Sequence, residues 1–168
     1  MIPKLLDRSQ AFKEASRVEI EISEGGTTVR LPVSQMAALG PLQLDIGDRV
    51  PGVVGKAFDV TSWYGAWKTS TGQTETGEPP THLQVEASDE FCATIPWEEL
   101  GQAAFLYEED GKPIKKGFPL RLYVPNGSSA CLNVKSVLKV RLLHDPSLGD
   151  EATYGYRNRL SPDDLRKG

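Results

Sequence analysis

The sequence predicts a single α+β domain made mostly of antiparallel strands with short helices. Apolar and polar residues alternate in many short runs, and turns rich in glycine, proline and asparagine separate these runs. A two-residue period is typical of strands with one buried face. Long helical patterns do not come between the runs, which disfavours a parallel sheet with crossover helices. At 168 residues the chain has the usual length of one domain.

The N-terminal part predicts a lead-in and a β-hairpin. Residues 1–17 are mainly polar, and Ser9 is a favourable N-cap for a short helix among them. Apolar residues alternate over 18–22 and again over 29–33, with a pair of glycines between the two runs. This arrangement predicts two antiparallel strands joined by a tight turn.

The following stretch predicts a helical turn, two strands and a polar loop. Ser34 is expected to cap a turn of helix over 35–39. Alternation over 42–46 predicts one strand, and residues 57–64 predict another that ends in aromatic residues. Residues 68–81 contain no strongly apolar side chain, so we expect them to form an exposed loop.

Further strands and one helical stretch are predicted in the second half. Residues 83–87 and 91–95 alternate, and residues 104–107 predict another short strand. Pro96 suits the first position of a helix, and the WEELGQA sequence after it predicts about two helical turns.

The run from Lys112 to Leu143 is the most informative part of the sequence. Residues 120–124 alternate, Pro125-Asn126-Gly127 turns the chain, and residues 138–142 alternate again. The pattern predicts a strand, a turn and a strand with one buried face.

The last residues predict a polar tail. Residues 144–168 have no strong hydrophobic period, and Ser161 is expected to cap a short helix within them. The predicted organisation is therefore a lead-in over 1–17, a core over 18–143 and a tail over 144–168.

Charge and composition exclude several classes of partner. The net charge is −4 with interspersed signs, which disfavours a nucleic-acid-binding protein because such proteins cluster their lysines and arginines. The hydrophobic fraction of 39% comes without a membrane-length apolar run or a signal peptide, so we expect a cytoplasmic protein with no membrane contact. The two cysteines, Cys92 and Cys131, are expected to stay thiols.

An aromatic cluster is the clearest candidate site that the residues themselves offer. Trp63, Tyr64 and Trp67 come directly before the polar loop. They either close the end of the core or line a binding surface, since Trp and Tyr combine apolar area with a polar tip. His82 and His144 have no companion ligands at zinc spacing, which favours structural or surface roles.

The C-terminal half also carries a family resemblance. GFPLRLYVPNG followed by VKSVLKVRLL resembles the signature of the sulfite oxidase-type molybdopterin-binding domain, where a Gly-x-Pro-Leu-Arg-Leu-x-Val-Pro strand precedes a strand that begins with Val-Lys. Upstream, residues 88–100, 104–107 and the Asp110-Gly111-Lys112-Pro113 corner follow the same order of elements. The similarity covers residues 18–143, is strongest after Leu83, and implies that family's α+β fold.

The resemblance also implies where a cofactor would bind. In that family a cysteine thiolate holds molybdenum, and the matching interval here, Leu42 to Tyr64, contains no cysteine. The family's pterin contacts carry over to Lys135, and in the turn to Asn126 and Ser128. We expect a ligand site between these residues and two tryptophans, Trp63 and Trp67.

Three functional hypotheses follow. The first is a divergent relative that has lost the metal-binding cysteine, has no cofactor, and acts as a non-catalytic binding or interaction module for a small anionic or pterin-like ligand or a protein partner. The second is a molybdenum-cofactor-dependent oxidoreductase that binds molybdopterin with Cys131 as a relocated metal ligand. The third is a β-rich interaction domain whose resemblance is accidental.

Overall fold

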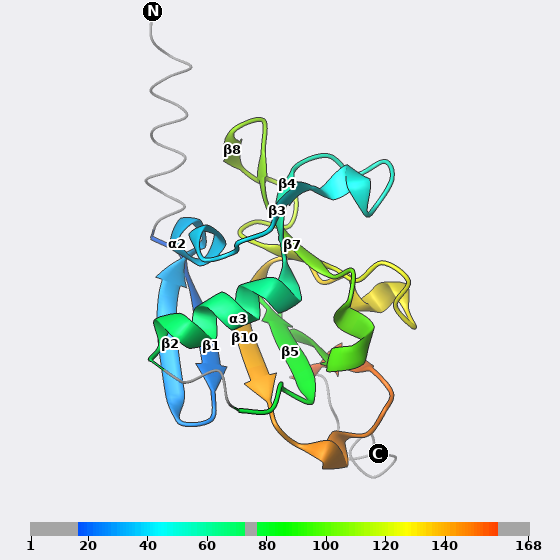
Figure 1. The fold of residues 1–168 in the computed structure, drawn as a ribbon. Coiled ribbons are helices and arrows are strands. Elements are labelled where there is room, and N and C mark those ends of the chain that lie inside the picture. Colours follow the sequence, from blue (N-terminus) through cyan, green and yellow to red (C-terminus); the bar gives the residue numbers. More distant parts are fainter. Residues whose placement is uncertain (1–16, 73–76, 158–168) are drawn as a thin grey trace, which may run out of the picture.

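The chain folds into two β-sheets and two α-helices over the residues that the structure describes. The computed structural model describes residues 17–72 and 77–157, so the helices expected at Ser9 and Ser161 lie outside the described residues. Most neighbouring strands are antiparallel, which confirms the α+β class predicted from the sequence. Figure 1 shows the second sheet reaching beyond α2, above the first sheet.

The first sheet has six strands in the order β11-β6-β5-β10-β1-β2. The predicted N-terminal hairpin is present as β1 and β2. All strand pairs are antiparallel except β1 and β10, which are parallel neighbours in the middle of the sheet. The strand bounds are β1 Glu19–Glu24, β2 Thr27–Pro32, β5 His82–Ala87, β6 Phe91–Pro96, β10 Val137–Leu143 and β11 Thr153–Tyr156.

The second sheet has five strands. Its order is β3-β4-β7-β8, and β9 pairs with β7. The bounds are β3 Gln43–Asp45, β4 Lys56–Asp59, β7 Ala104–Glu109, β8 Lys112–Pro113 and β9 Arg121–Tyr123.

The predicted strand, turn and strand of residues 112–143 do not pair with each other. Both predicted strands are present, β9 in the second sheet and β10 in the first, so the segment between them joins two sheets. Leu122 and Val140 nevertheless face the same core, as the alternation predicts. The alternation fixes which side chains are buried, but it does not fix which strand lies alongside.

Two helices cover the core. The helix α2, Val33–Ala38, has Pro32 as its N-cap, so the capping role expected for Ser34 is wrong. The helix α3 spans Val60–Ser70 and Figure 1 shows it crossing the strands β1, β10 and β5.

The strand predicted over residues 57–64 is half wrong, because it divides into β4 and the start of α3. The Asp59 side chain accepts a hydrogen bond from the Ser62 backbone N–H at 3.0 Å and so caps the helix. The buried residues Val60, Trp63, Tyr64 and Trp67 then follow the i, i+3, i+4, i+7 spacing of one helical face. Residues 68–70, predicted as loop, belong to α3, and residues 73–76 lie outside the described chain.

Two further elements differ from the sequence prediction. The helix expected after Pro96 is a single 3₁₀ turn, η2, over Trp97–Leu100, and Pro96 is its N-cap. The tail contributes the edge strand β11, which pairs with β6 and was not predicted. Its Gly155 and polar neighbours hide the two-residue period, because an edge strand buries little.

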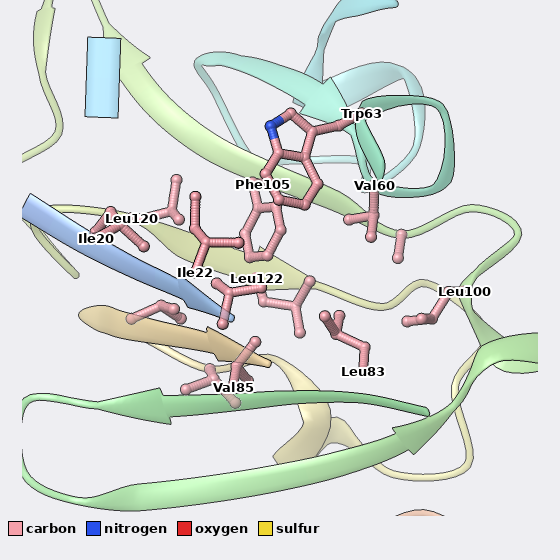
Figure 2. Packing of buried hydrophobic residues seen from close by; sticks show 14 of the residues in the cluster. Ile20, Ile22, Val60, Trp63, Leu83, Val85, Leu100, Phe105, Leu120 and Leu122 are labelled. Atoms are coloured by element: carbon pink, nitrogen blue, oxygen red, sulfur yellow. The ribbon is translucent and has the colours of Figure 1, made fainter. Parts of the chain in front are cut away.

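The apolar side chains form a large core and a small cluster. The large core joins the inner face of the first sheet, both helices and one face of the second sheet. Figure 2 shows part of it, with Ile22 of the first sheet, Trp63 of α3 and Phe105 of the second sheet. The small cluster lies on the other face of the second sheet, against the 3₁₀ turn η1 over Ile46–Asp48. The small cluster consists of Ile46, Ala57, Ala104, Leu106, Ile114 and Tyr123.

Candidate ligand-binding site

A cavity lies in the corner between α2 and the part of the second sheet that extends past it. We call it the α2 pocket, and its volume is about 370 Å³. Its walls come from α2, from the strands β3, β4, β7 and β8, and from residues 118–119. Val33 and Ala37 on the helix side and Pro113, Phe118 and Pro119 on the other side make the lining mainly apolar.

The helix wall of the α2 pocket is fixed to the core. The indole N–H of Trp63 donates to the backbone carbonyl of Met36 at 3.0 Å, so a buried hydrogen bond joins α3 to α2. Gly40 follows the helix, where a Cβ atom would come within 2.9 Å of the Phe58 side chain. The chain can therefore turn from α2 directly onto the second sheet only with glycine at this position.

A side-chain amide joins the end of α2 to the sheet. Gln43 on β3 donates from Nε2 to the carbonyls of Ala37 and Gly40, both at 2.9 Å. Its Oε1 accepts a hydrogen bond from the Tyr107 hydroxyl at 2.7 Å. Burial and the nearby carboxylate of Glu108 raise the pKa of Tyr107, so the hydroxyl keeps its proton at neutral pH.

A β-bulge turns two consecutive side chains toward the α2 pocket. Lys56 is opposite Glu108 and Ala57 is opposite Leu106, so Tyr107 is the extra residue between β4 and β7. Consecutive side chains of a regular strand point to opposite faces, yet Tyr107 and Glu108 both line the pocket. Gly55 adjoins the bulge with φ of +139°, and a Cβ there would lie 2.6 Å from the Glu108 carbonyl oxygen.

The chemistry of the α2 pocket suits binding. Its lining contains no cysteine or histidine, and its one carboxylate is Glu108. Within the described residues, no group of three or more His, Cys, Asp or Glu side chains is placed to hold a metal ion. The volume lies in the range of about 300–1,000 Å³ that is common for small-molecule sites.

The residues predicted from the aromatic cluster lie elsewhere. Trp63 and Trp67 are completely buried in the large core, with their rings stacked at 6.1 Å between centroids. The structure thus gives them the core-packing role rather than an exposed binding surface. Helical spacing explains this burial, because both follow Asp59 on the inner face of α3.

The residues predicted from the family resemblance are only partly brought together. Lys135 and Cys131 line a shallow hollow of about 230 Å³, together with Asp89. The exposed turn at Asn126 and Ser128 does not line this hollow. Ser128 is held by hydrogen bonds from its backbone N–H and its hydroxyl to a Glu99 carboxylate oxygen, at 3.3 and 3.2 Å.

A molybdenum cofactor does not fit the hollow at Cys131. The volume is below the usual lower limit of about 300 Å³ for small-molecule sites. The Asp89 carboxylate lines the same hollow and would repel the phosphate of a pterin cofactor. Both cysteines are free thiols, and burial raises the pKa of the Cys92 thiol, which suits a structural role on its strand.

Sequence reasoning missed the polar residues of the α2 pocket. Gln43, Lys56, Tyr107 and Glu108 come from three strands, and no short motif joins them. The only local signal is Gly55. The reason that a glycine is required there becomes clear only when the pairing of β4 with β7 is known.

A second polar cluster ties the first sheet together. The Tyr64 hydroxyl donates to Glu24 Oε2 at 2.5 Å, and His144 Nε2 lies 2.7 Å from the same oxygen. Burial, the hydrogen bond and the charge of Glu24 raise the pKa of Tyr64. The cluster joins the end of β1 to α3 and to the segment after β10.

The other histidine also links distant segments. His82 is buried, and its Nε2 lies 2.8 Å from the Gly149 carbonyl oxygen.

No protein-family model matches this chain, and no curated protein matches it either. The similarity to the sulfite oxidase-type domain therefore stands on the sequence motifs alone. None of the described helices is long and apolar enough to cross a membrane.

Proposed function

We propose that this protein is a non-catalytic binding module that takes a small, mainly apolar molecule in the α2 pocket. We further propose that it is a divergent relative of the sulfite oxidase-type molybdopterin-binding domain without the metal-binding cysteine. The observation that carries the binding function is the pocket itself, in which an irregular strand turns Tyr107 and Glu108 toward an apolar cavity.

The position of the α2 pocket supports the proposed relationship. The interval that lacks the family's cysteine, residues 42–64, supplies Gln43 and Lys56 to the lining. The Gly-x-Pro-Leu-Arg motif supplies Phe118 and Pro119. The interval in which that family holds its metal and one segment of the shared signature therefore meet at this cavity.

The lining of the α2 pocket supports binding without catalysis. The lining holds no thiol and no imidazole, the groups that most often act as nucleophile and base in enzymes, and its Glu108 carboxylate is placed to hold a charged ligand. Tyr107 is a poor base because its pKa is raised and its proton is donated to Gln43. Its hydroxyl can position a ligand by hydrogen bonding.

Fragment binding followed by NMR tests the proposal. The backbone amides of the full chain would be monitored while a library of small apolar compounds is added. We expect shifts concentrated at α2, Tyr107 and Phe118. The variant Ala38→Phe fills the pocket from the exposed side of α2 and should weaken binding at least tenfold.

A matched control separates filling of the pocket from a general effect. Ala130→Phe adds the same side chain at an exposed position outside the α2 pocket and should leave binding unchanged. A melting temperature equal to that of the wild type in both variants would show that the fold is intact. Binding that survives Ala38→Phe would refute the proposed site.

The oxidoreductase alternative makes a different prediction. Protein purified from a host that makes the cofactor would contain stoichiometric molybdenum and pterin, and Cys131→Ser would remove the metal. That result would replace the proposed function. The accidental-resemblance alternative makes its own prediction: the strand order of this chain would differ from that of sulfite oxidase-type domains.

A further inference from the structure

The polar end of the α2 pocket carries one positive and one negative side chain. Lys56 and Glu108 are directly opposite each other on β4 and β7, and both line the pocket. Within the part of the chain that the structure describes, neither of them forms an ion pair within 4.0 Å. Lys56 is exposed and Glu108 is half-buried, so both charges are available at the mouth of the cavity.

The hydrogen-bonding capacity at this end is limited to a few groups. Both Nε2 hydrogens of Gln43 are used on backbone carbonyls, and the hydroxyl hydrogen of Tyr107 is used on Gln43. The Tyr107 oxygen and the Glu108 carboxylate can still accept, and the Lys56 ammonium can still donate. A ligand must therefore present donors to Tyr107 and Glu108 and an acceptor to Lys56.

We propose that the α2 pocket recognises a zwitterion with an apolar body, such as an α-amino acid with a large apolar side chain. The ligand's ammonium faces Glu108 and the Tyr107 oxygen, and its carboxylate faces Lys56. Its side chain lies against Val33, Ala37 and Phe118. This inference rests on the proposed function, because it names the ligand class of the same pocket.

Other ligand classes match the charges less well. A dicarboxylate or a phosphate would meet the like charge of Glu108, and a polyamine would meet that of Lys56. A neutral apolar molecule would cover Glu108 without a partner, and an unpaired polar group in a covered site lowers affinity. Only a ligand with both charges side by side satisfies both residues.

Calorimetry with matched compounds tests the inference. The probes are L-phenylalanine, N-acetyl-L-phenylalanine, which lacks the ammonium, and L-phenylalanine amide, which lacks the carboxylate. We expect each derivative to bind at least tenfold more weakly than the free amino acid. A neutral probe, 3-phenylpropanol, should be weaker than all three.

Variants assign each charge to its partner. Glu108→Gln should weaken L-phenylalanine and its amide about tenfold but leave the N-acetyl compound unchanged. Lys56→Met should weaken L-phenylalanine and the N-acetyl compound but leave the amide unchanged. Glu109→Gln and Lys112→Met are the matched controls, because this pair is also opposite on adjacent strands but does not line the α2 pocket.

The outcomes separate this inference from the proposed function. Selective loss in the two pocket variants supports both. If neutral apolar fragments bind the α2 pocket as tightly as L-phenylalanine does, the zwitterion inference is refuted and the binding function stands. If neither fragments nor amino acids bind there, both are refuted.

Discussion

The two faces of the second sheet differ in how completely they are covered. One face packs into the large core against both helices and the first sheet, where Phe58 and Phe105 are fully buried. The other face carries only the small cluster, covered by the η1 turn and neighbouring loop residues. The α2 pocket is lined by α2 and by residues of β3, β4, β7 and β8. These strands belong to the second sheet, which Figure 1 shows reaching beyond α2. The comparison indicates that stability resides in the large core and that the pocket lies at its margin.

The largest effect should come from the centre of the large core. Trp63→Ala removes a fully buried indole and the hydrogen bond to the Met36 carbonyl that holds α2. We expect the free energy of unfolding to fall by about 4 kcal/mol. Urea denaturation followed by circular dichroism measures this change. A loss below about 1 kcal/mol would contradict the central role of the large core.

A matched pair of leucines compares the two faces directly. Leu83 is completely buried in the large core, and Leu106 is nearly as buried in the small cluster. We expect Leu83→Ala to cost about 3 to 4 kcal/mol and Leu106→Ala about 2 kcal/mol, since the thinner cover of the small cluster can relax into the cavity. Equal losses in urea denaturation would remove the distinction between the faces.

The hydroxyls of Tyr64 and Tyr107 should also contribute unequally to stability, with the larger contribution from the large core. Tyr64→Phe takes a hydrogen bond from the buried carboxyl group of Glu24 and should cost about 2 kcal/mol. Tyr107→Phe takes one from the exposed Gln43 amide and should cost less than about 1 kcal/mol. Thermal unfolding of both variants, each with unchanged circular dichroism, would measure the difference. A larger loss for Tyr107→Phe would reverse the comparison.

The smallest effect is expected on the outer face of the first sheet and depends on pH. Burial raises the pKa of Glu86, but hydrogen bonds from Arg157 and Arg141 outweigh it, and the net pKa lies below its ordinary value of 4.5. Because the pKa is lowered, the ionised Glu86 stabilises the folded state. This stabilisation is fully present above the unfolded-state pKa and is lost as the pH falls through the folded-state pKa. Because Arg157 is largely exposed, the effect should stay below about 1 kcal/mol.

The variant Glu86→Gln tests this pH dependence. Between about pH 6 and about pH 3, the wild type should lose more stability than the variant, because only the wild type gains a proton at this position. Urea denaturation at several pH values measures both slopes. Parallel slopes would mean that the ion pairs around Glu86 do not contribute.

The sequence predicted the fold class and most strands because the alternation of a strand is a local property. The β1 and β2 hairpin is the clearest case, since its turn and both patterns lie within one short stretch. The start of α3 was missed because its first residues also suit a strand, and the decisive cap at Asp59 is a single side chain. The site was missed for another reason: the bulge at Tyr107 exists only between two paired strands.

The parallel pairing of β1 with β10 has a consequence for folding during synthesis. These strands are nearly the whole described chain apart in sequence, yet they are neighbours in the middle of the first sheet. On the ribosome, β1 and β2 emerge well before β10, and one edge of β1 stays open until residues 137–143 follow. Contacts of such long sequence separation form slowly, and an open strand edge can pair with other chains. The nascent hairpin therefore exposes an unpaired strand edge until β10 has been made.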